Sequence, residues 1–446
     1  MTALDHWAER SRKDRFIAKL VIFLNRAIYR EVTAHHVAPP PQSGPQLSVS
    51  NHFGGLSDAL VLLQVMARRP SIVARDVIWR IPVVGWLMTW IGGIPVHKPE
   101  DGGDGSNNDQ MFRSCYGALA DGGHMLIFPE GVTRNEPSIA RVKTGAARIA
   151  LGARSKGVTG LKITPAGIHY EDKAALRSRI VVIFDEAIDL DIEAETLTGD
   201  DEPLSADSRE AVDALTARID ERLRRAAPDF EDWDEARALA KAAEIAIRPQ
   251  LDDARQPVPV GLRDRLANVL ADRPAEQRQL IREAVDTYQD DLEGVHLTDA
   301  GAHHRRSKGR LATDLVVQTM IGLLLLPFAI VGAAINLIPF LIVKAVGLLR
   351  VAPSVHSSIK PAVAFVAFGA MWAVVVWRAA SAYGLLGAAA AVVLLPVYFA
   401  ATVLLIDRVT LTWRMLGRWR ARGRVGSIPQ RLAESHDAVV RAVLEV

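Results

Sequence analysis

The stretch LSVSNHFGGLSDALVLL, residues 47–63, decides the fold. It starts with a short apolar run, passes through a polar segment with two adjacent glycines, and continues into a run rich in leucine and alanine. A short apolar run is typical of a buried strand, and the longer run is typical of a helix. The stretch therefore predicts a strand, a tight loop and a helix, with His52 where the strand ends and Asp58 where the helix begins.

The same alternation of strands and helices continues along the chain. Strand, helix and strand in succession over about 150 residues predict the α/β class, with a mostly parallel or mixed sheet and flanking helices. In such sheets the carboxyl ends of the strands carry the functional site. The predicted strands are Leu47–Ser50, Ser71–Ala74, Gly93–Val96, Met125–Phe128, Ile163–Ile168 and Ile180–Phe184, and the predicted helices lie near 58–67, 107–121 and 142–154.

The His52–Asp58 pair predicts a general base. A neutral imidazole accepts a proton near neutral pH, because the ordinary pKa of histidine is about 6.5. A carboxylate bonded to one ring nitrogen fixes the tautomer and leaves the other nitrogen able to act as a base. The motif has no serine or cysteine nucleophile beside it, so the activated hydroxyl belongs to a substrate. A histidine with a purely structural role and an ordinary helix cap is the alternative.

Further polar residues follow other predicted strands. Glu130 and Gly131 follow one strand in FPEG, and Arg134 and Lys143 come next. His97 and Lys98 follow another strand. Cationic side chains of this kind can hold an anionic group, so the sequence predicts a site for a phosphorylated alcohol beside the histidine. The alternative is an ordinary solvated basic surface.

Composition narrows the classes of function. The chain has 446 residues, so two or three domains are expected, and its net charge of +2 does not favour nucleic acid as a partner. Cys115 is the one cysteine, which excludes an internal disulfide and fits a reducing compartment. The charged N-terminus does not resemble a secretory signal.

The chain divides by composition into four segments. We expect an N-terminal amphipathic helix and linker (1–45), the α/β domain (46–230), a charged helical segment (231–310) and a membrane region (311–446). The N-terminal helix has an apolar face and many basic residues, so it lies on an anionic bilayer or packs on its own domain. The tryptophans Trp79, Trp86 and Trp90 recur at helical spacing, which favours a core stripe. The alternatives are the lining of an acyl groove and a position at the membrane interface.

The membrane region contains long uncharged runs. Residues 361–377 and 383–406 predict a transmembrane hairpin, 361–406, because a bilayer core requires about 20 apolar residues in a helix. Basic residues flank the whole region on both sides, which favours cytoplasmic placement of both ends. The run 315–343, interrupted by Pro327 and Pro339, is therefore predicted to be re-entrant, followed by the hairpin and a basic tail. Three straight spans are the alternative.

These motifs resemble the glycerolipid acyltransferase superfamily. The family's four blocks are similar to residues 51–58, 93–98, 128–134 and 163–167, in that order. The stretches NHFGGLSDAL (51–60) and EGVTRNEPSIARVKTGAARIAL (130–151) also resemble the branch that uses glycerol 3-phosphate and carries a C-terminal membrane region. The commonest family form has four residues between His and Asp, whereas five stand here and Ser57 occupies the usual aspartate position.

The resemblance implies an O-acyltransferase of phospholipid biosynthesis. His52 would take the proton from the hydroxyl of glycerol 3-phosphate, which then attacks the thioester of acyl-CoA or acyl carrier protein. Backbone amides near residues 130–132 would stabilise the oxyanion. Asp58 and Glu130 complete the catalytic set, no metal or cofactor is required, and the site would face the cytoplasm from the inner membrane. The residues implied for binding the phosphate or the acceptor are Lys98, His97, Gly131, Arg134 and Lys143.

Two other functions stay open at this stage. One is acylation of lysophosphatidate or another lysophospholipid, because the four blocks do not separate the acceptors. The other is an inactive, membrane-anchored lipid-binding scaffold. In every case the phospholipid bilayer is the expected partner.

Overall fold

A computed structural model describes most of the chain. The described residues are 11–80, 84–96, 107–133, 136–171, 177–197, 206–251, 258–294, 297–302, 308–346, 353–421 and 428–444. They form two compact units, Met1–Glu231 with Ala352–Ser358, and Asp232–Val351 with Ile359–Val446.

The first unit is built on a mixed sheet. Among the described residues its strands follow the order β1-β7-β6-β2-β5-β3-β4, with β8 beside β6. Neighbouring strands are parallel except that β6 runs antiparallel to β7 and β8. The strands are β1 Glu31–His36, β2 Gln46–Ser50, β3 Ser71–Arg75, β4 Ile94–Val96, β5 His124–Ile127, β6 Lys162–Tyr170, β7 Arg179–Phe184 and β8 Ile188–Asp189.

The predicted α/β class and all six predicted strands are confirmed. Two further strands were not predicted from the sequence. β1 lies within residues 1–45 and pairs with β7 at the edge of the sheet, where its side chains are partly exposed and leave no apolar pattern. β8 has only two residues, too few for any pattern.

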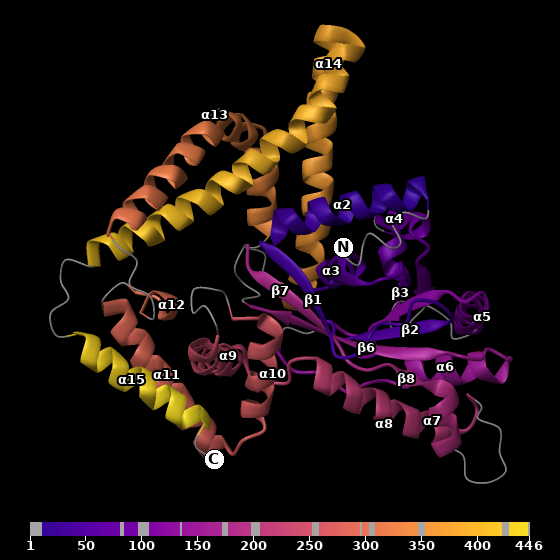
Figure 1. Cartoon of the computed structure of the whole chain (residues 1–446). Coiled ribbons are helices and arrows are strands. Elements are labelled where there is room, and N and C mark those ends of the chain that lie inside the picture. Colours follow the sequence, from indigo (N-terminus) through magenta and orange to yellow (C-terminus); the bar gives the residue numbers. More distant parts are fainter. Residues whose placement is uncertain are drawn as a thin grey trace. The chain divides into compact units, whose positions relative to one another are not determined.

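Helices cover both faces of the sheet. α2 (Arg12–Ile28) and α3 (Leu56–Val65) lie on one face, and α6 (Gly145–Ser155) and α8 (Arg209–Ala226) lie on the other (Figure 1). The core beneath α6 and α8 joins buried residues of both helices to the central strands, such as Leu47 of β2 and Ile163 of β6. Burial of this surface anchors β2, whose last residue precedes the His52 loop. The other helices of the unit are α4 Val84–Trp90, α5 Asn107–Ala120, α7 Leu190–Leu197 and the 3-10 turn η1 Asp76–Arg80.

The N-terminal helix packs on its own domain and exposes Phe16 to solvent, next to two tryptophans of α4. Asn25 of α2 is buried, and its Nδ2 donates to the carbonyl of Leu60 in α3 at 2.9 Å. Phe16, on the same helix, is 60% exposed and meets the Trp90 ring edge-on at 6.0 Å. Trp86 stacks on Trp90 and is 67% exposed, so the expectation of a core stripe is wrong for this residue. We call Phe16, Trp86 and Trp90 the aromatic patch.

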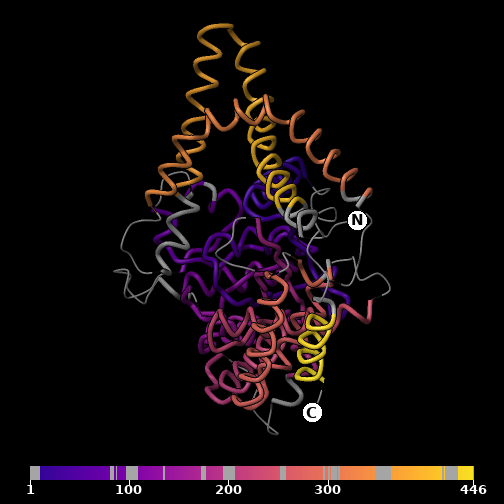
Figure 2. Tube along the Cα trace, turned by 90° about the vertical axis from the view of Figure 1, so that its left-hand side faces the viewer, coloured from indigo at the N-terminus to yellow at the C-terminus, as the bar shows by residue number. Residues whose placement is uncertain are grey.

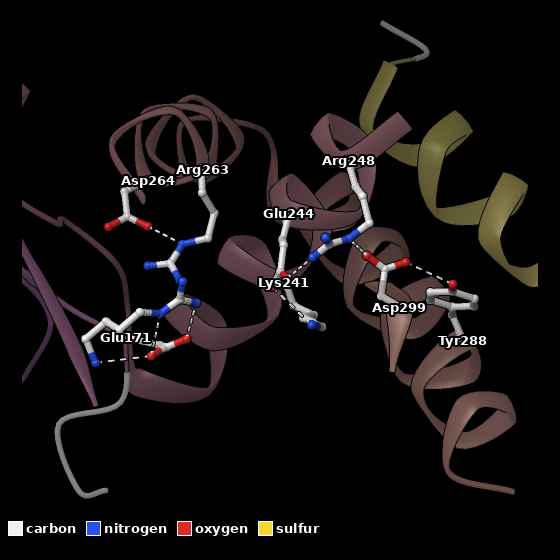
Figure 3. Close-up of polar contacts among 9 residues, drawn as sticks. Glu171, Lys241, Glu244, Arg248, Arg263, Asp264, Tyr288 and Asp299 are labelled. Carbon is white, nitrogen blue, oxygen red and sulfur yellow. Dashed lines mark hydrogen bonds and ion pairs between the residues drawn. The ribbon is translucent and has the colours of Figure 1, made fainter. Parts of the chain in front are cut away.

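The second unit contains a group of packed helices. They are α9 Trp233–Ile247, η3 Arg248–Gln250, α10 Val260–Ala271, α11 Ala275–Gly294, α12 Asp299–Ala302 and α15 Ile428–Leu444. A buried polar cluster ties several of them together: the Arg248 guanidinium pairs with Glu244 and Asp299, and the Tyr288 hydroxyl donates to Asp299 at 3.0 Å (Figure 3). Burial is tolerated because each charge has a partner.

Two long apolar helices complete the second unit. α13 (Lys308–Val346) contains Pro327 and Pro339. The helix is bent like an inverted V, so that its two ends point in the same general direction (Figure 2). α14 (Pro353–Ala421) turns back on itself at Gly384, whose φ of 65° is left-handed. The stretches Ala312–Val346 and Val363–Trp413 are apolar and long enough to cross a membrane, by length and composition. Prolines account for the bend because they remove an intrahelical hydrogen bond.

Polar contacts join α13 to α14. Arg408 donates to Gln318 at 2.7 Å and Thr402 donates to the carbonyl of Ala329 at 3.1 Å. The indole of Trp372 donates to Asn336, which is buried, at 3.0 Å. Hydrogen bonds between apolar helices pair groups that lipid cannot satisfy, so they fix how the two helices pack.

The segment after α14 returns to the helices that precede α13. Arg431 of α15 pairs with Asp291 of α11 at 2.9 Å, and Val439 of α15 is fully buried. Arg273 donates to the carbonyl of Val443 at 2.8 Å. If the apolar region between these helices enters a bilayer, their packing places both of its ends in one aqueous compartment, which requires an even number of crossings.

We therefore expect α11 and α15 to lie on the same side of the membrane. The test uses Leu280→Cys in α11, Leu444→Cys in α15 and Leu385→Cys beside Gly384, all at exposed positions. Native Cys115 is fully buried and should not react. A membrane-impermeant maleimide added to intact cells should label position 385 and leave 280 and 444 protected. Labelling of only one of the latter two would support three straight spans.

We also expect the aromatic patch to enter the bilayer interface, where Trp and Phe beside basic residues are favoured. A nitroxide at Phe16→Cys in proteoliposomes should be more accessible to oxygen than to a polar nickel complex. Ile192→Cys is the matched control, because Ile192 is an apolar side chain of similar exposure, 63%. Equal accessibility profiles at the two positions would contradict the prediction.

Candidate functional site

The candidate site lies at the carboxyl end of β2, in the middle of the sheet. Asn51 follows the strand, and its buried side chain extends the sheet: Oδ1 accepts from the Ile168 amide at 2.7 Å and Nδ2 donates to the Ile168 carbonyl at 3.1 Å. These two bonds replace a backbone ladder at the point where the chain leaves the strand. The next residue, His52, therefore starts from a fixed position.

His52 and Asp58 meet as the sequence predicted. The Nδ1 of His52 lies 2.9 Å from Oδ2 of Asp58, whose side chain is fully buried while the imidazole is 19% exposed. The ring also stacks on Phe128, with centroids 4.0 Å apart and planes at 20°. With Asp58 ionised, Nδ1 carries the proton and Nε2 is left with its lone pair. Among the described residues no hydrogen-bond partner of Nε2 is found.

The Asp58 carboxylate accepts hydrogen bonds from several elements. Oδ2 also accepts the amide of Gly54 at 2.7 Å, and Oδ1 accepts the hydroxyl of Tyr170 at the end of β6. Burial, together with the Asp58 carboxylate, raises the pKa of Tyr170 well above its usual value. Burial also raises the pKa of Tyr29, at the end of α2, to about 12. Both phenols are therefore protonated at neutral pH, and a protonated phenol can donate to the carboxylate.

Glu130 holds the backbone of the site. Its Oε1 accepts the amide of His52 at 2.9 Å, and its Oε2 accepts the amide of Ala140 at 2.8 Å. The side chain is fully buried. One carboxylate thus ties the His52 loop to the segment that follows β5. This geometry favours ordering of the loop as the role of Glu130.

Gly131 and Lys143 lie together beside this loop. The turn that holds Glu130 closes with the Gly131 amide donating to the Phe128 carbonyl at 3.0 Å, so this amide is engaged within the turn. Gly131 has a left-handed φ of 65°, and a Cβ built on it would lie 3.3 Å from Nζ of Lys143. The ammonium group therefore lies over the turn, and a larger residue at position 131 would displace it.

Three of the predicted site residues cannot be placed. His97, Lys98 and Arg134 fall outside the described residues. Their assignment to the phosphate remains a prediction. Within the described ranges, no cluster of three or more His, Cys, Asp or Glu side chains could hold a metal ion.

Three further residues contribute to the site without a role predicted from the sequence: Asn51, Tyr170 and Phe128. Asn51 stands in the quoted motif, so its position could have been singled out. Tyr170 is 112 residues from Asp58 and ends an apolar strand, where a tyrosine is an ordinary core residue. Its contact with the carboxylate depends on the pairing of β2 with β6, which local spacing does not contain.

Known proteins match this part of the chain. An acyltransferase family model matches residues 31–169. The chain is 30% identical over 141 residues to glycerol-3-phosphate O-acyltransferase 2 of Saccharomyces cerevisiae, covering 31% of this chain and 18% of that protein. It is 26% identical over 157 residues to the chloroplastic 1-acyl-sn-glycerol-3-phosphate acyltransferase LPAT1 of Arabidopsis thaliana, covering 35% of this chain and 41% of the relative. The chain thus spans less than half of the length of either relative.

A solved structure also matches. The 1-acyl-sn-glycerophosphate (LPA) acyltransferase PlsC of Thermotoga maritima has 18% sequence identity and a TM-score of 0.34, over 48% of this chain and 84% of that one.

The geometry predicts that Glu130→Gln weakens the first unit. A glutamine amide has one acceptor oxygen, so one of the two backbone amides loses its partner, at a cost of about 1–3 kcal/mol. The apparent unfolding temperature should fall by about 2–4 °C for each kcal/mol. Glu136→Gln, the same change at an exposed position nearby, should have little effect in the same thermal scan. An unchanged transition for Glu130→Gln would show that the bridge does not contribute.

Proposed function

We propose that this chain, whose residues 31–169 match an acyltransferase family model, is an enzyme of the glycerolipid acyltransferase superfamily. It would transfer a long-chain acyl group from a thioester to the hydroxyl of glycerol 3-phosphate. The observation that supports this most directly is the His52–Asp58 pair, with Nε2 of His52 left without a partner among the described residues. Such a ring is oriented to accept a proton from a bound hydroxyl. The acyl donor would be acyl-CoA or acyl carrier protein.

The proposed reaction uses His52 as a general base. As the acceptor oxygen attacks the thioester carbonyl, its proton passes to Nε2, and Asp58 stabilises the imidazolium through Nδ1. The tetrahedral intermediate then collapses, the C–S bond breaks, and the proton moves from His52 to the leaving thiolate. The products are an ester and a free thiol, and the histidine returns to its starting state.

Cationic side chains would hold the acceptor's phosphate. Lys143 supports this proposal, because its ammonium group lies over the Gly131 turn that follows β5. Lys98, Arg134 and His97 are proposed to complete the phosphate site from the neighbouring strand ends. An ammonium or guanidinium group neutralises a phosphate dianion and so fixes the distance of the hydroxyl from the base.

The acceptor has a second candidate. Among the relatives, the yeast protein is named for glycerol 3-phosphate, whereas the Arabidopsis protein is named for 1-acyl-sn-glycerol 3-phosphate. The two acceptors share the phosphate and differ by an acyl chain. We place glycerol 3-phosphate first because the relative with the highest identity of the two is named for it.

We propose that the enzyme works at the cytoplasmic face of the inner membrane. Two apolar helices suggest association with the membrane. Basic residues flank the apolar region on both sides, including Lys308 and Arg310 before it and Arg418 and Arg420 after it. Basic flanks favour the cytoplasmic side, and the product of the reaction is itself a lipid.

The proposal predicts that His52→Ala abolishes transfer. Loss of a general base lowers turnover by about 10²–10⁴-fold. The purified full chain in detergent is given palmitoyl-CoA with glycerol 3-phosphate or lysophosphatidate, and the product lipid is identified by mass spectrometry. Binding of palmitoyl-CoA should be retained in the variant, because the imidazole acts in the transition state.

His436→Ala is the matched control. It removes another histidine paired with an aspartate, Asp437 at 3.2 Å, in the second unit, and should leave turnover unchanged. Near-normal transfer by His52→Ala would overturn the assignment of the base. Product from lysophosphatidate alone would favour the second acceptor. Binding of the thioester with no transfer to either acceptor would support the lipid-binding scaffold instead.

A further inference from the structure

We propose that Tyr170 is a positioning residue, which holds the Asp58 carboxylate at the angle that His52 requires. This inference rests on the proposed function, in which His52 is the base. The Tyr170 hydroxyl reaches Asp58 from the carboxyl end of β6, whereas Asp58 stands in the first turn of α3. A residue of the sheet therefore fixes the orientation of a carboxylate that belongs to a helix.

The hydrogen bonds of Asp58 divide its two oxygens between separate tasks. Oδ2 accepts both the Nδ1–H of His52 and the amide of Gly54, at 2.9 and 2.7 Å, while Oδ1 accepts the Tyr170 hydroxyl. A carboxylate can rotate about its Cβ–Cγ bond, and contacts at Oδ2 alone do not prevent this. The bond at Oδ1 fixes the rotation and so points Oδ2 at the imidazole.

Gly54 supplies a second, independent observation. Its φ lies outside the left-handed region, so the backbone there admits any residue. A Cβ at position 54, however, would lie 2.3 Å from the Tyr170 hydroxyl and 2.7 Å from Oδ1 of Asp58. The space above Gly54 is thus occupied by the hydroxyl–carboxylate pair, and glycine is the residue that leaves room for it.

The length of the loop between His52 and Asp58 explains why the carboxylate requires a hydrogen bond from outside the loop. Five residues separate His52 from Asp58, and the loop closes on itself through the Ser57 hydroxyl, which donates to the Gly54 carbonyl at 2.8 Å. The Ser57 bond sets the path of the backbone, and the Gly54 amide binds Oδ2 of Asp58, but neither bond reaches Oδ1. Tyr170 binds Oδ1 from outside the loop.

Among the described contacts, the neighbours of Asp58 supply hydrogen-bond donors, and none of them adds a second charged group. Besides His52 and Tyr170, Tyr29 and Ser57 lie beside it, at the end of α2 and in α3. Because the pKa of Tyr170 is raised well above its usual value, its hydroxyl stays protonated across any practical assay range. The donor to Oδ1 is therefore constant. The Tyr170 hydroxyl also hydrogen-bonds to the side chains of Ser57 and Tyr29, so Tyr170→Phe removes these bonds together with the bond to Asp58.

Tyr170→Phe should change the pH dependence of the reaction. A buried carboxylate that loses one donor attracts the proton on His52 more strongly, so the base becomes neutral only at higher pH. The acid limb of kcat/KM should move upward by about half a pH unit or more, and kcat should fall about tenfold, because one charge-assisted hydrogen bond is lost. KM for the acceptor should stay within about a factor of two, because the buried Tyr170 hydroxyl would act through Asp58 and not on the acceptor.

Tyr288→Phe is the matched control. Tyr288 is also a buried phenol that donates to a buried aspartate, Asp299 at 3.0 Å, but it belongs to the second unit (Figure 3). Both variants should lose thermal stability. Only Tyr170→Phe should move the acid limb, which a merely structural role would leave in place.

Gly54→Ala tests the same bond from the opposite side. The new methyl group would meet the Tyr170 hydroxyl, Oγ of Ser57 and Oδ1 of Asp58, so it would separate the hydroxyl from the carboxylate while Tyr170 itself remains. The acid limb should again move upward. If one of the two variants fails to fold, the other still decides the question. An unmoved acid limb in a folded variant of either kind would overturn the proposal.

A readout without substrate separates this inference from the proposed function. Diethyl pyrocarbonate reacts with neutral imidazole, and peptide mass spectrometry follows carbethoxylation of His52 at each pH. The midpoint of this reaction should move upward in Tyr170→Phe and stay in place in Tyr288→Phe. A shifted midpoint in a chain that transfers no acyl group would support the positioning role and contradict the proposed function. Normal acyl transfer with an unchanged midpoint would support the proposed function and contradict the positioning role.

Discussion

The site depends on one buried carboxylate. Asp58 is fully removed from solvent, and an ionised group in that position is stable only when hydrogen-bond donors replace the lost water. Its donors come from the His52 ring, the Gly54 amide and the Tyr170 hydroxyl. Because these groups belong to the loop after β2 and to the end of β6, the carboxylate joins the helix α3 to the centre of the sheet.

A second carboxylate performs a similar task for the backbone. Glu130 binds the amides of His52 and Ala140, so the loop after β2 and the segment after β5 are held by one side chain. Asn51 continues the ladder of β6 beyond the end of β2. Together these contacts position the imidazole on three neighbouring strands, which is more rigid than a position on a loop alone. Under the proposed function, the Nε2 face of the ring is the part left for a reacting hydroxyl.

In the second unit, ion pairs and buried apolar side chains hold together helices that are far apart in the sequence. α15 comes after the long apolar helices and still packs on α11, through Arg431, Asp291 and the buried Val439. The charged composition of residues 231–310 is therefore compatible with a packed core, because the apolar face of each helix is covered by another. Between α13 and α14, the indole of the partly buried Trp372 donates a hydrogen bond to the buried Asn336.

The sequence by itself determined the α/β class, six of the strands, the two apolar helices and the meeting of His52 with Asp58. Each of these follows from local patterns: apolar runs, glycines in a short loop, and uncharged stretches of membrane length. Tertiary structure alone decided the edge strand β1, the return of α15, and the roles of Tyr170 and Asn51. These depend on pairing between segments more than a hundred residues apart, as between Asp58 and Tyr170. A side chain at the end of an apolar strand has the same local pattern whether it fills the core or holds a carboxylate, and only the folded sheet distinguishes the two.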